Sequence, residues 1–285
     1  VMLSVFDKLN EKTMEHYDSL PETQLTDESE RKRSSMLNNR GDIRFGQGRF
    51  DDALAAYEQS LVIRRRLREA NPNTMEPMRD ESFSLERIGD AQLALGNFER
   101  ARIAYDASFQ TRRDLLELNS GSEIEQNAYG VALAKKGEFF LTRGQISKAA
   151  EQFRAAQTFL KKLADAEPRN VGRQRSLVAA NVRLGAFRSD AGNPSAAEAM
   201  CAQVRSRLDE LIRKHPNHML LKSDLSAVIS RQGKLAMNQS QLGAAETYFA
   251  ASTGILERLV EHDPSNLDWK QRLSNNLSES GHALM

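Results

Sequence analysis

The sequence has one cysteine, Cys201, among 285 residues, so it cannot form a disulfide within the chain. A chain with so little cysteine suits a reducing compartment, and we expect a cytoplasmic protein. Its longest apolar runs are far shorter than the roughly 20 residues that a membrane span requires. The N-terminus also lacks the basic segment that opens a signal peptide. We therefore predict no membrane span.

Aromatic residues make up only 6% of the chain, and valine and isoleucine are sparse beside alanine, leucine, arginine and glutamate. This balance favours helices over sheets. Neither sign of charge dominates, because 40 lysine and arginine residues stand against 39 aspartate and glutamate residues. A near-neutral chain with few aromatic residues is not a general polyanion binder, which disfavours nucleic acid as a partner.

Sequence motifs of catalysis and metal binding are missing as well. The chain contains no His-Glu-x-x-His, no phosphate-binding glycine loop and no Gly-x-Ser-x-Gly. His215 and His218 flank Pro216, but no third ligand lies nearby in the sequence, so they indicate a polar loop. We predict no catalytic, cofactor-binding or metal-binding residues and no enzymatic activity.

What the sequence does have is a repeat of 48 residues. Six glycines, here called the lattice glycines, are separated by 48 each time (89 − 41 = 48): Gly41, Gly89, Gly137, Gly185, Gly233 and Gly281. Twelve residues after the first five come the lattice alanines, Ala53, Ala101, Ala149, Ala197 and Ala245. Four residues further on lie Tyr57, Tyr105, Phe153, Cys201 and Phe249. Such a register indicates tandem structural units, with the small residues placed where helices cross closely.

Turn residues keep the same period. Seven residues after the first five lattice glycines come the turn residues, Gly48, Gly96, Gly144, Gly192 and Ser240. A glycine permits the positive φ that ends a helix and reverses the chain. A second series marks the end of each unit: Pro72, Ser120, Pro168, Pro216 and Pro264. Proline cannot continue a helix, so each unit is predicted to be a helical hairpin.

The pattern resembles the tetratricopeptide repeat family. The resemblance is carried by Leu-x-x-x-Gly, as in Leu37 to Gly41, and by the turn glycine, the Ala-x-x-x-Tyr/Phe pair and the closing proline. It implies an all-α, right-handed α-solenoid of antiparallel helical hairpins. The usual repeat is about 34 residues long, so each helix here has gained about two turns. Long repeats of this kind look like those of large bacterial signalling and effector proteins.

The repeat also predicts how the chain is organised. We expect a capping helix and loop over 1–27, five hairpins over 28–264, and the first helix of a sixth hairpin over 265–285. The first helices of the hairpins, called A helices, are predicted near 28–46, 78–94, 123–142, 170–190 and 218–238. The second helices, called B helices, are predicted near 50–70, 98–118, 146–166, 194–214 and 242–262. Asp27 and Glu30 suggest a capping box. Because the chain starts and stops in mid-repeat, we expect a piece of a longer protein.

The resemblance implies that A helices line a concave groove where a partner binds. Two residues before a lattice glycine lie Arg87, Lys135, Arg183 and Arg231, and one residue after it lie Asp42, Asp90, Glu138, Ala186 and Lys234. The eight charged residues of this set are the candidate partner-binding residues. One interpretation is weak pairing within each helix, such as Arg87 with Asp90 and Lys135 with Glu138. The other is a polar track that holds a peptide, with acidic partner residues lying against repeats four and five.

Three further features have less specific interpretations. The basic clusters of the B helices, Arg64–Arg66 with Arg68, Arg112–Arg113 and Lys161–Lys162, are predicted to be a solvated face. Cys201 takes an aromatic position of the lattice and is predicted to be a buried, inert thiol. Trp269 has two open interpretations, packing against repeat five or exposure in an interface.

The best functional hypothesis is a protein-interaction scaffold or sensor module that binds a partner peptide or domain along its groove. We expect it to be part of a larger bacterial signalling or effector protein. One alternative is an RNA-binding helical repeat, which a steep salt dependence of binding would reveal. Another is a regulatory array of an enzyme whose catalytic domain lies outside this sequence.

Overall fold

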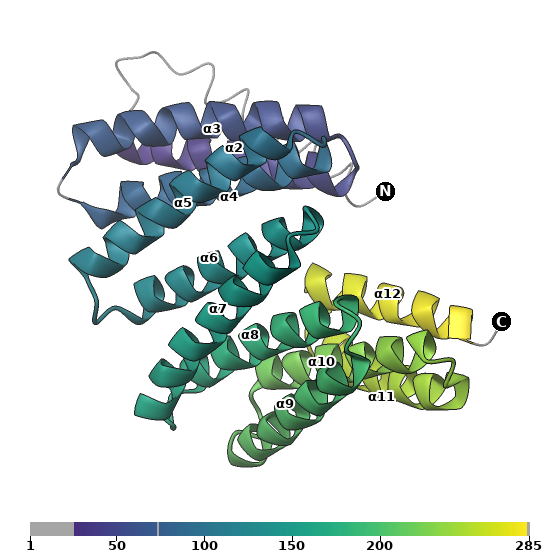
Figure 1. Cartoon of the computed structure of the whole chain (residues 1–285). Helices are drawn as coiled ribbons and strands as arrows, with labels where there is room; N and C mark the ends of the chain where they lie inside the picture. Colours follow the sequence, from purple (N-terminus) through teal and green to yellow (C-terminus); the bar gives the residue numbers. More distant parts are fainter. Residues whose placement is uncertain (1–25, 73, 284–285) are drawn as a thin grey trace. The chain divides into compact units, whose positions relative to one another are not determined.

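The computed structural model describes residues 26–72 and 74–283. These residues form eleven α-helices and no strand, which confirms the predicted all-α fold (Figure 1). The capping helix predicted for the N-terminal segment lies outside the described residues. No helix among the described residues has the length and apolar character needed to cross a membrane.

The helices alternate as predicted between A and B types. The A helices are α2 (Asp27–Gly46), α4 (Met75–Ala94), α6 (Glu123–Thr142), α8 (Val171–Asp190), α10 (Met219–Asn238) and α12 (Leu267–Ala283). The B helices are α3 (Phe50–Ala70), α5 (Phe98–Leu118), α7 (Ile146–Ala166), α9 (Pro194–Lys214) and α11 (Leu242–His262). The five B helices have the predicted bounds. The first five A helices start within three residues of the predicted position (78 − 75 at α4). The grouping of the helices into domains stays a prediction.

The chain divides into two compact units, Val1–Lys136 and Gly137–Met285, with the boundary inside α6. In the first unit α2 packs on α3, α3 on α4 and α4 on α5. In the second unit each helix from α7 to α11 packs on the next one along the chain. The A helices α8 and α10 also touch, as do α10 and α12. Hairpins stacked on their sequence neighbours in this way form an α-solenoid.

The turn inside each hairpin has the same geometry at all five turn residues. The four glycines have φ between 65° and 79°, and Ser240 has φ of 60°. The residue after each one donates its backbone N–H to the carbonyl five residues earlier, as Arg49 does to Arg44 at 2.9 Å. This bond satisfies a carbonyl that the helix end would otherwise leave unpaired. The predicted positive φ at the turn glycines is confirmed.

The start of α2 differs from the sequence-based expectation. Thr26, not Asp27, is the N-cap, and the capping box joins Thr26 to Ser29. The Ser29 N–H donates to Thr26 Oγ1 at 3.2 Å, and the Thr26 N–H donates to Ser29 Oγ at 2.8 Å. Glu30 is instead buried and pairs with Arg66 of α3. The predicted capping box was one residue too late. Thr26 with Ser29 and Asp27 with Glu30 have the same spacing, and spacing alone does not separate the two pairs.

The lattice residues form the contact between the two helices of a hairpin. All five lattice alanines are fully buried. A Cβ added at Gly89 would lie 2.6 Å from the ring of Tyr105, and one at Gly233 would lie 2.9 Å from the ring of Phe249. The glycine therefore gives the aromatic ring of the B helix room against the backbone of the A helix. This contact confirms the predicted close helix crossing and explains why the glycine and the aromatic residue repeat together.

Candidate functional site

The charged residues beside the lattice glycines meet between neighbouring A helices. The acidic residue of one A helix pairs with the basic residue 45 positions later on the next A helix (87 − 42 = 45). We call these contacts cross-repeat ion pairs. Their N–O distances are 3.2 Å each: Arg87 Nε to Asp42, Lys135 Nζ to Asp90, and Arg183 Nε to Glu138. The first two pairs lie in the first unit and the third lies in the second unit.

The structure adds cross-repeat contacts to the pairing within a helix that the sequence suggested. Arg87 does approach Asp90 in its own helix, at 3.6 Å, but its contact with Asp42 of the preceding helix is shorter. Lys135 likewise reaches back to Asp90. The role of the eight candidate residues in partner binding stays a prediction. The sequence places the alternative partners three residues away in the same helix and 45 residues away in the neighbouring one, and the repeat pattern alone does not decide between them.

In the first unit a tyrosine hydroxyl joins each cross-repeat ion pair. Tyr57 Oη donates to Asp42 Oδ1 at 2.8 Å, and Tyr105 Oη donates to Asp90 Oδ1 at 2.6 Å. Burial and the hydrogen bond to Asp42 raise the pKa of Tyr57. Each aspartate thus lies between a phenol and the cation of the next repeat. We call such a set of hydroxyl, carboxylate and cation a triad.

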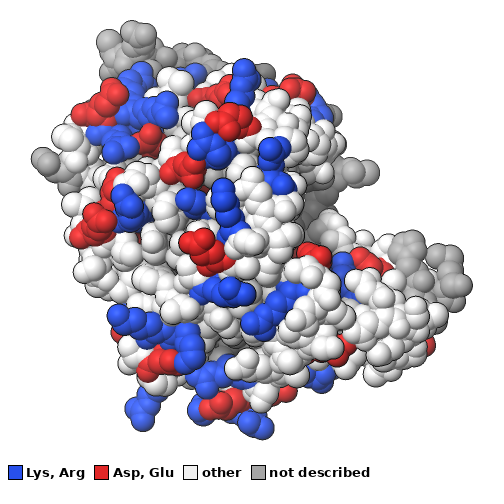
Figure 2. All heavy atoms as spheres, viewed as in Figure 1, with Lys and Arg blue, Asp and Glu red and all other residues white. Residues whose placement is uncertain are grey.

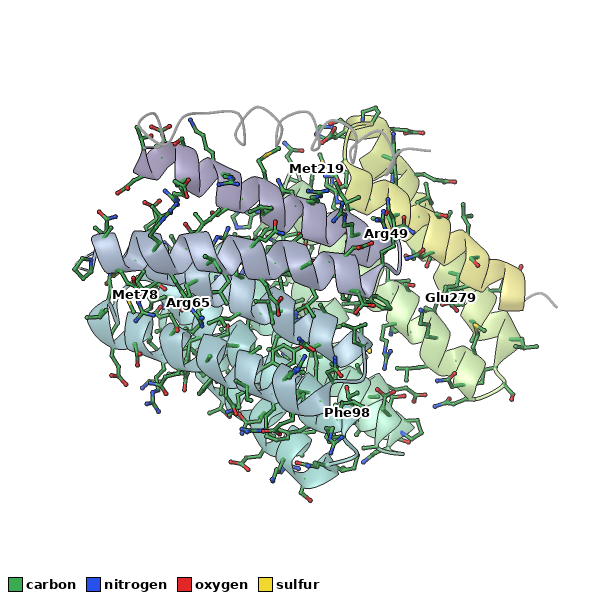
Figure 3. All side chains as sticks on the ribbon, turned by 90° about the horizontal axis from the view of Figure 1, so that it is seen from above. Arg49, Arg65, Met78, Phe98, Met219 and Glu279 are labelled. Carbon is green, nitrogen blue, oxygen red and sulfur yellow. The ribbon has the colours of Figure 1, made fainter. Side chains whose placement is uncertain are left out.

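The second unit departs from this pattern at the end of the array. Lys234 of α10 pairs with Glu279 of α12 at 2.7 Å, again 45 residues apart but with the charges reversed. Glu279 is labelled in Figure 3. An ion pair is therefore present here too, although Lys234 stands where the first three repeats carry an aspartate or a glutamate. The side chains of Arg183 and Lys234 remain 34% and 44% exposed, so both can be reached by a partner.

Arg231 has no carboxylate partner 45 residues earlier, because that position is Ala186. Within the described residues it forms an ion pair with Asp190, where the shortest N–O distance is 3.9 Å. Its Nε is buried and makes no hydrogen bond to any described residue. The triad position of the tyrosine is taken here by Cys201, a buried thiol whose pKa is raised by burial. The predicted burial of Cys201 is confirmed.

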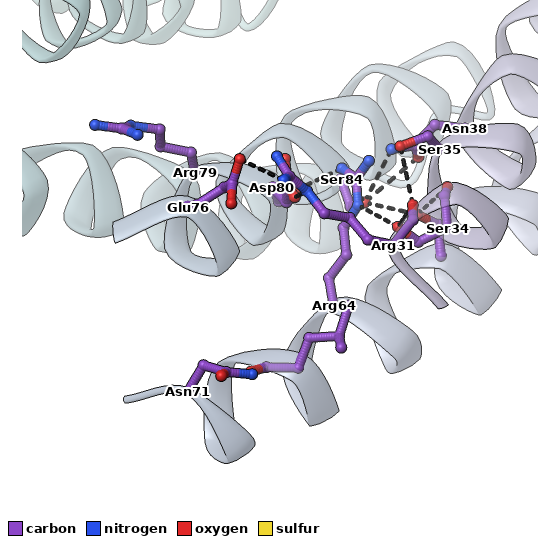
Figure 4. A network of polar contacts seen from close by, with 12 residues as sticks. Arg31, Ser34, Ser35, Asn38, Arg64, Asn71, Glu76, Arg79, Asp80 and Ser84 are labelled. Carbon is purple, nitrogen blue, oxygen red and sulfur yellow. Dashed lines mark hydrogen bonds and ion pairs between the residues drawn. The ribbon is translucent and has the colours of Figure 1, made fainter. Parts of the chain in front are cut away.

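A different polar cluster lies inside the first unit, around Arg64 of α3 (Figure 4). Its guanidinium donates to Ser34 Oγ at 3.2 Å, to the Asp80 carbonyl at 2.6 Å and to Ser84 Oγ at 3.1 Å. Arg64 is buried, and burial lowers its pKa to about 10. The prediction of a solvated basic face was therefore wrong for Arg64. It also fails in part for Arg112, whose pKa is lowered by burial.

The described residues also line several cavities. A cavity of 280 Å³ borders Arg64, and one of 230 Å³ lies between α10, α11 and α12. Two larger cavities, of 410 Å³ beside Arg65 and Met78 and of 420 Å³ beside Met219 and Leu259, reach the roughly 300–1,000 Å³ of typical ligand pockets. No three His, Cys, Asp or Glu side chains in the part of the chain that the structure describes converge to hold a metal ion. Trp269 packs against Leu256 and Leu259, which decides its open interpretation in favour of the core.

Comparison with known proteins agrees with the geometry. Residues 32–107 match the sequence model of the tetratricopeptide repeat family. The fold is similar to BtubC (BKLC) from P. vanneervenii, at 14% identity over 82% of each chain, with a TM-score of 0.59. It is also similar to a Rap protein complexed with competence and sporulation factor, at 15% identity over 99% of this chain and 74% of that one, with a TM-score of 0.50. None of the curated proteins that were compared matches the sequence.

These findings define the class. At this level of identity the structural likenesses show the fold, and the family match covers residues 32–107. The chain is an α-solenoid similar to tetratricopeptide repeat proteins, and its helical hairpins have a period of 48 residues (89 − 41). Such repeats are in general protein-interaction scaffolds, and no membrane-spanning helix is found among the described residues.

Proposed function

We propose that this protein is an interaction module that binds an acidic segment of a partner protein along the A helices of its second unit. The proposal is supported by the regular placement of charged side chains on successive A helices, because rows of this kind suit an extended ligand. A fold similar to this one occurs in the Rap protein, which was solved in complex with competence and sporulation factor. We place the module in the cytoplasm, within a larger bacterial signalling or effector protein.

The observation that carries the proposal is the change in charge balance between the two units. In the first unit each candidate cation faces an aspartate of the preceding repeat. In the second unit Ala186 and Lys234 take the two later acidic positions, so the A helices of that unit carry an excess of positive charge at these sites. Electrostatic complementarity then favours a partner segment rich in Asp or Glu.

The distribution of charge over the visible surface favours a protein partner over nucleic acid. Basic and acidic side chains are interspersed on the face seen in Figure 2, and the net charge of the chain is +1. A nucleic-acid surface needs a continuous basic stripe that follows the phosphate backbone. Local basic positions surrounded by acids suit a segment with a matching charge pattern instead.

The proposal is tested by charge reversal after a partner has been captured with the purified chain. Arg183→Glu with Arg231→Glu should weaken partner binding more than tenfold, about 1.4 kcal/mol, because two attractive contacts become repulsive. The matched control reverses two exposed lysines of α7 in the same unit, Lys161→Glu with Lys162→Glu, and should change affinity little. Binding is measured by titration calorimetry at two salt concentrations, with melting curves to check folding.

Equal losses from the two double variants would contradict the assignment to the A helices. A loss confined to the α7 variant would move the binding surface to the B helices. Failure of the chain to capture any partner would count against the interaction function itself.

A further inference from the structure

Three positions of the repeat lattice build a triad, and comparison between repeats shows where one is incomplete. In repeats one and two the aromatic position carries tyrosine, the position after the lattice glycine carries aspartate, and the next repeat supplies the cation. The same three positions at repeat four hold Cys201, Ala186 and Arg231. The cation is kept, while both the carboxylate and the hydroxyl are absent.

Arg231 is consequently held with its hydrogen-bonding capacity partly unused. Its side chain is 25% exposed, and its Nε is buried without a hydrogen bond to any described residue, as is the Nε of Arg87. Asp190, whose side chain is 56% exposed, stands 3.9 Å away, beyond hydrogen-bond distance. What Arg231 lacks in comparison with Arg87 is therefore a carboxylate at close ion-pair distance.

Of the two groups that repeat four lacks, only the carboxylate can be supplied from outside, because Met200 already fills the place of the aromatic ring. A Cβ added at Gly185 would lie 3.3 Å from Met200 Cγ, so Met200 covers this lattice glycine in place of the ring. The phenol position therefore offers no room for a ligand, whereas the side-chain position of Ala186 ends at a methyl group. The carboxylate that Asp42 places beside Arg87 therefore has no counterpart at Arg231 in the same register.

The Lys234–Glu279 pair shows that an acidic residue on the next A helix can replace a missing acid of the lattice. At the next repeat the acidic position became Lys234, and Glu279 restores an ion pair at 2.7 Å. Arg231 has no such replacement within the described chain at hydrogen-bond distance. Of the five cross-repeat positions in the described residues, the one at Ala186 alone lacks a charged residue on one side.

We propose that an Asp or Glu side chain of the bound partner lies beside Ala186 and pairs with Arg231, so that the partner supplies the carboxylate that this cross-repeat ion pair lacks. This inference rests on the proposed interaction function and assigns it one contact residue. A carboxylate at that point accepts charge-assisted hydrogen bonds from a guanidinium that is held in place by the helix. Arg183 and Lys234 each already have a carboxylate partner within the chain, so we expect Arg231 to make the strongest of the three contacts with the partner's acid.

The test follows the Nε–Hε resonance of Arg231 by NMR, which detects weak binding. The probe is an acetylated octapeptide of alternating alanine and glutamate, and the matched control has glutamine for glutamate. We expect the Arg231 resonance to shift with the acidic peptide and to stay unmoved with the neutral one. Absence of a shift with the acidic peptide at millimolar concentration would overturn the inference.

Two variants of one position make the test specific. Ala186→Asp supplies the missing carboxylate from within the chain, so it should raise the melting temperature and weaken peptide binding at Arg231 at least tenfold. Ala186→Asn has nearly the same size without the charge and should keep the peptide response. An unchanged response in Ala186→Asp would overturn the inference, as would equal losses in the two variants.

Two more experiments distinguish this inference from a general anion site and from the proposed interaction function as a whole. Acetate at the same carboxylate concentration should bind Arg231 more weakly than the peptide, and equal affinity would mean a general anion site and overturn the assignment to a partner segment. A captured partner that binds Arg231→Gln as tightly as the parent would overturn the inference while the interaction function stands. Loss of partner binding in Ala186→Asp, but not in Ala186→Asn, would support both.

Discussion

At the residue scale, the lattice glycines matter through the aromatic rings that cover them. Gly89 leaves no room for a Cβ against Tyr105, whereas Gly254 in the middle of α11 has nothing within 4 Å of an added Cβ. The two glycines are both helical, so they share the same intrinsic preference for replacement by alanine. A comparison of alanine variants at the two glycines therefore distinguishes the effect of packing on stability from the effect of helix propensity.

We expect Gly89→Ala to lower the free energy of unfolding by about 1–3 kcal/mol, because the new methyl group forces Tyr105 from its place. Gly254→Ala should raise it by up to about 1 kcal/mol, because alanine favours the helix and meets no obstacle. Urea denaturation of the three proteins measures both changes. Similar shifts in the two variants would show that the lattice glycine has no special packing role.

Ala101→Leu, at a fully buried lattice alanine, should destabilise by overpacking as well.

Arg64 shows where sequence reasoning about single residues failed. A run of three arginines near the end of a helix indicates a solvated face when it is considered alone. In the 48-residue register, however, Arg64 shares its position with Leu160, Leu208 and Leu256, all of them buried. The register therefore contained the signal for burial. The polar partners that make burial of a guanidinium tolerable lie on two other helices and could not be found from local sequence.

At the scale of the element, the hairpin turn is the most regular feature of the chain. Ser240 adopts the same left-handed backbone as the four turn glycines, with φ of 60° against 79° at Gly192. A residue with a Cβ is strained in this region because the Cβ crowds the following carbonyl. The fifth turn is thus formed at a cost that the other four avoid.

We expect Ser240→Gly to stabilise the protein by about 1 kcal/mol, since it removes that steric strain. The reciprocal change Gly192→Ser should destabilise it by a similar amount, about 1 kcal/mol, at an equivalent turn of the same unit. Thermal and urea unfolding of both variants check the pair. If neither variant differs from the parent, the backbone strain at Ser240 has been relieved by its surroundings.

The positions of the helices were largely predictable, and the reason is physical. Proline and turn glycine mark the helix ends, while the lattice alanines and aromatic residues fix which face of each B helix is buried. The cross-repeat ion pairs were not predicted. They depend on how far one A helix is shifted along its neighbour, which a pattern within one repeat does not define. Pairing within a helix was the nearest alternative that the sequence alone could suggest.

At the scale of the whole molecule, cross-repeat ion pairs connect hairpins that are separate in the sequence. The Lys234–Glu279 pair offers a direct test, because its reversed polarity makes a charge exchange informative. Lys234→Glu should lower stability by about 0.5–1 kcal/mol, since a surface pair is lost and a like-charge contact replaces it. Adding Glu279→Lys should restore most of that loss. A double-mutant cycle from urea denaturation measures the coupling, and a coupling near zero would mean that the contact has no part in stability.

The polarity of these pairs has a consequence for how the array can grow by tandem duplication. Repeats two and three carry a cation before the lattice glycine and an acid after it, so a duplicated copy would meet its original with opposite charges. Repeat five carries Arg231 before its glycine and Lys234 after it, and two adjacent copies would bring these cations together. A duplication in the middle of the array would therefore keep its ion pairs, whereas a duplication of repeat five would add a contact between like charges.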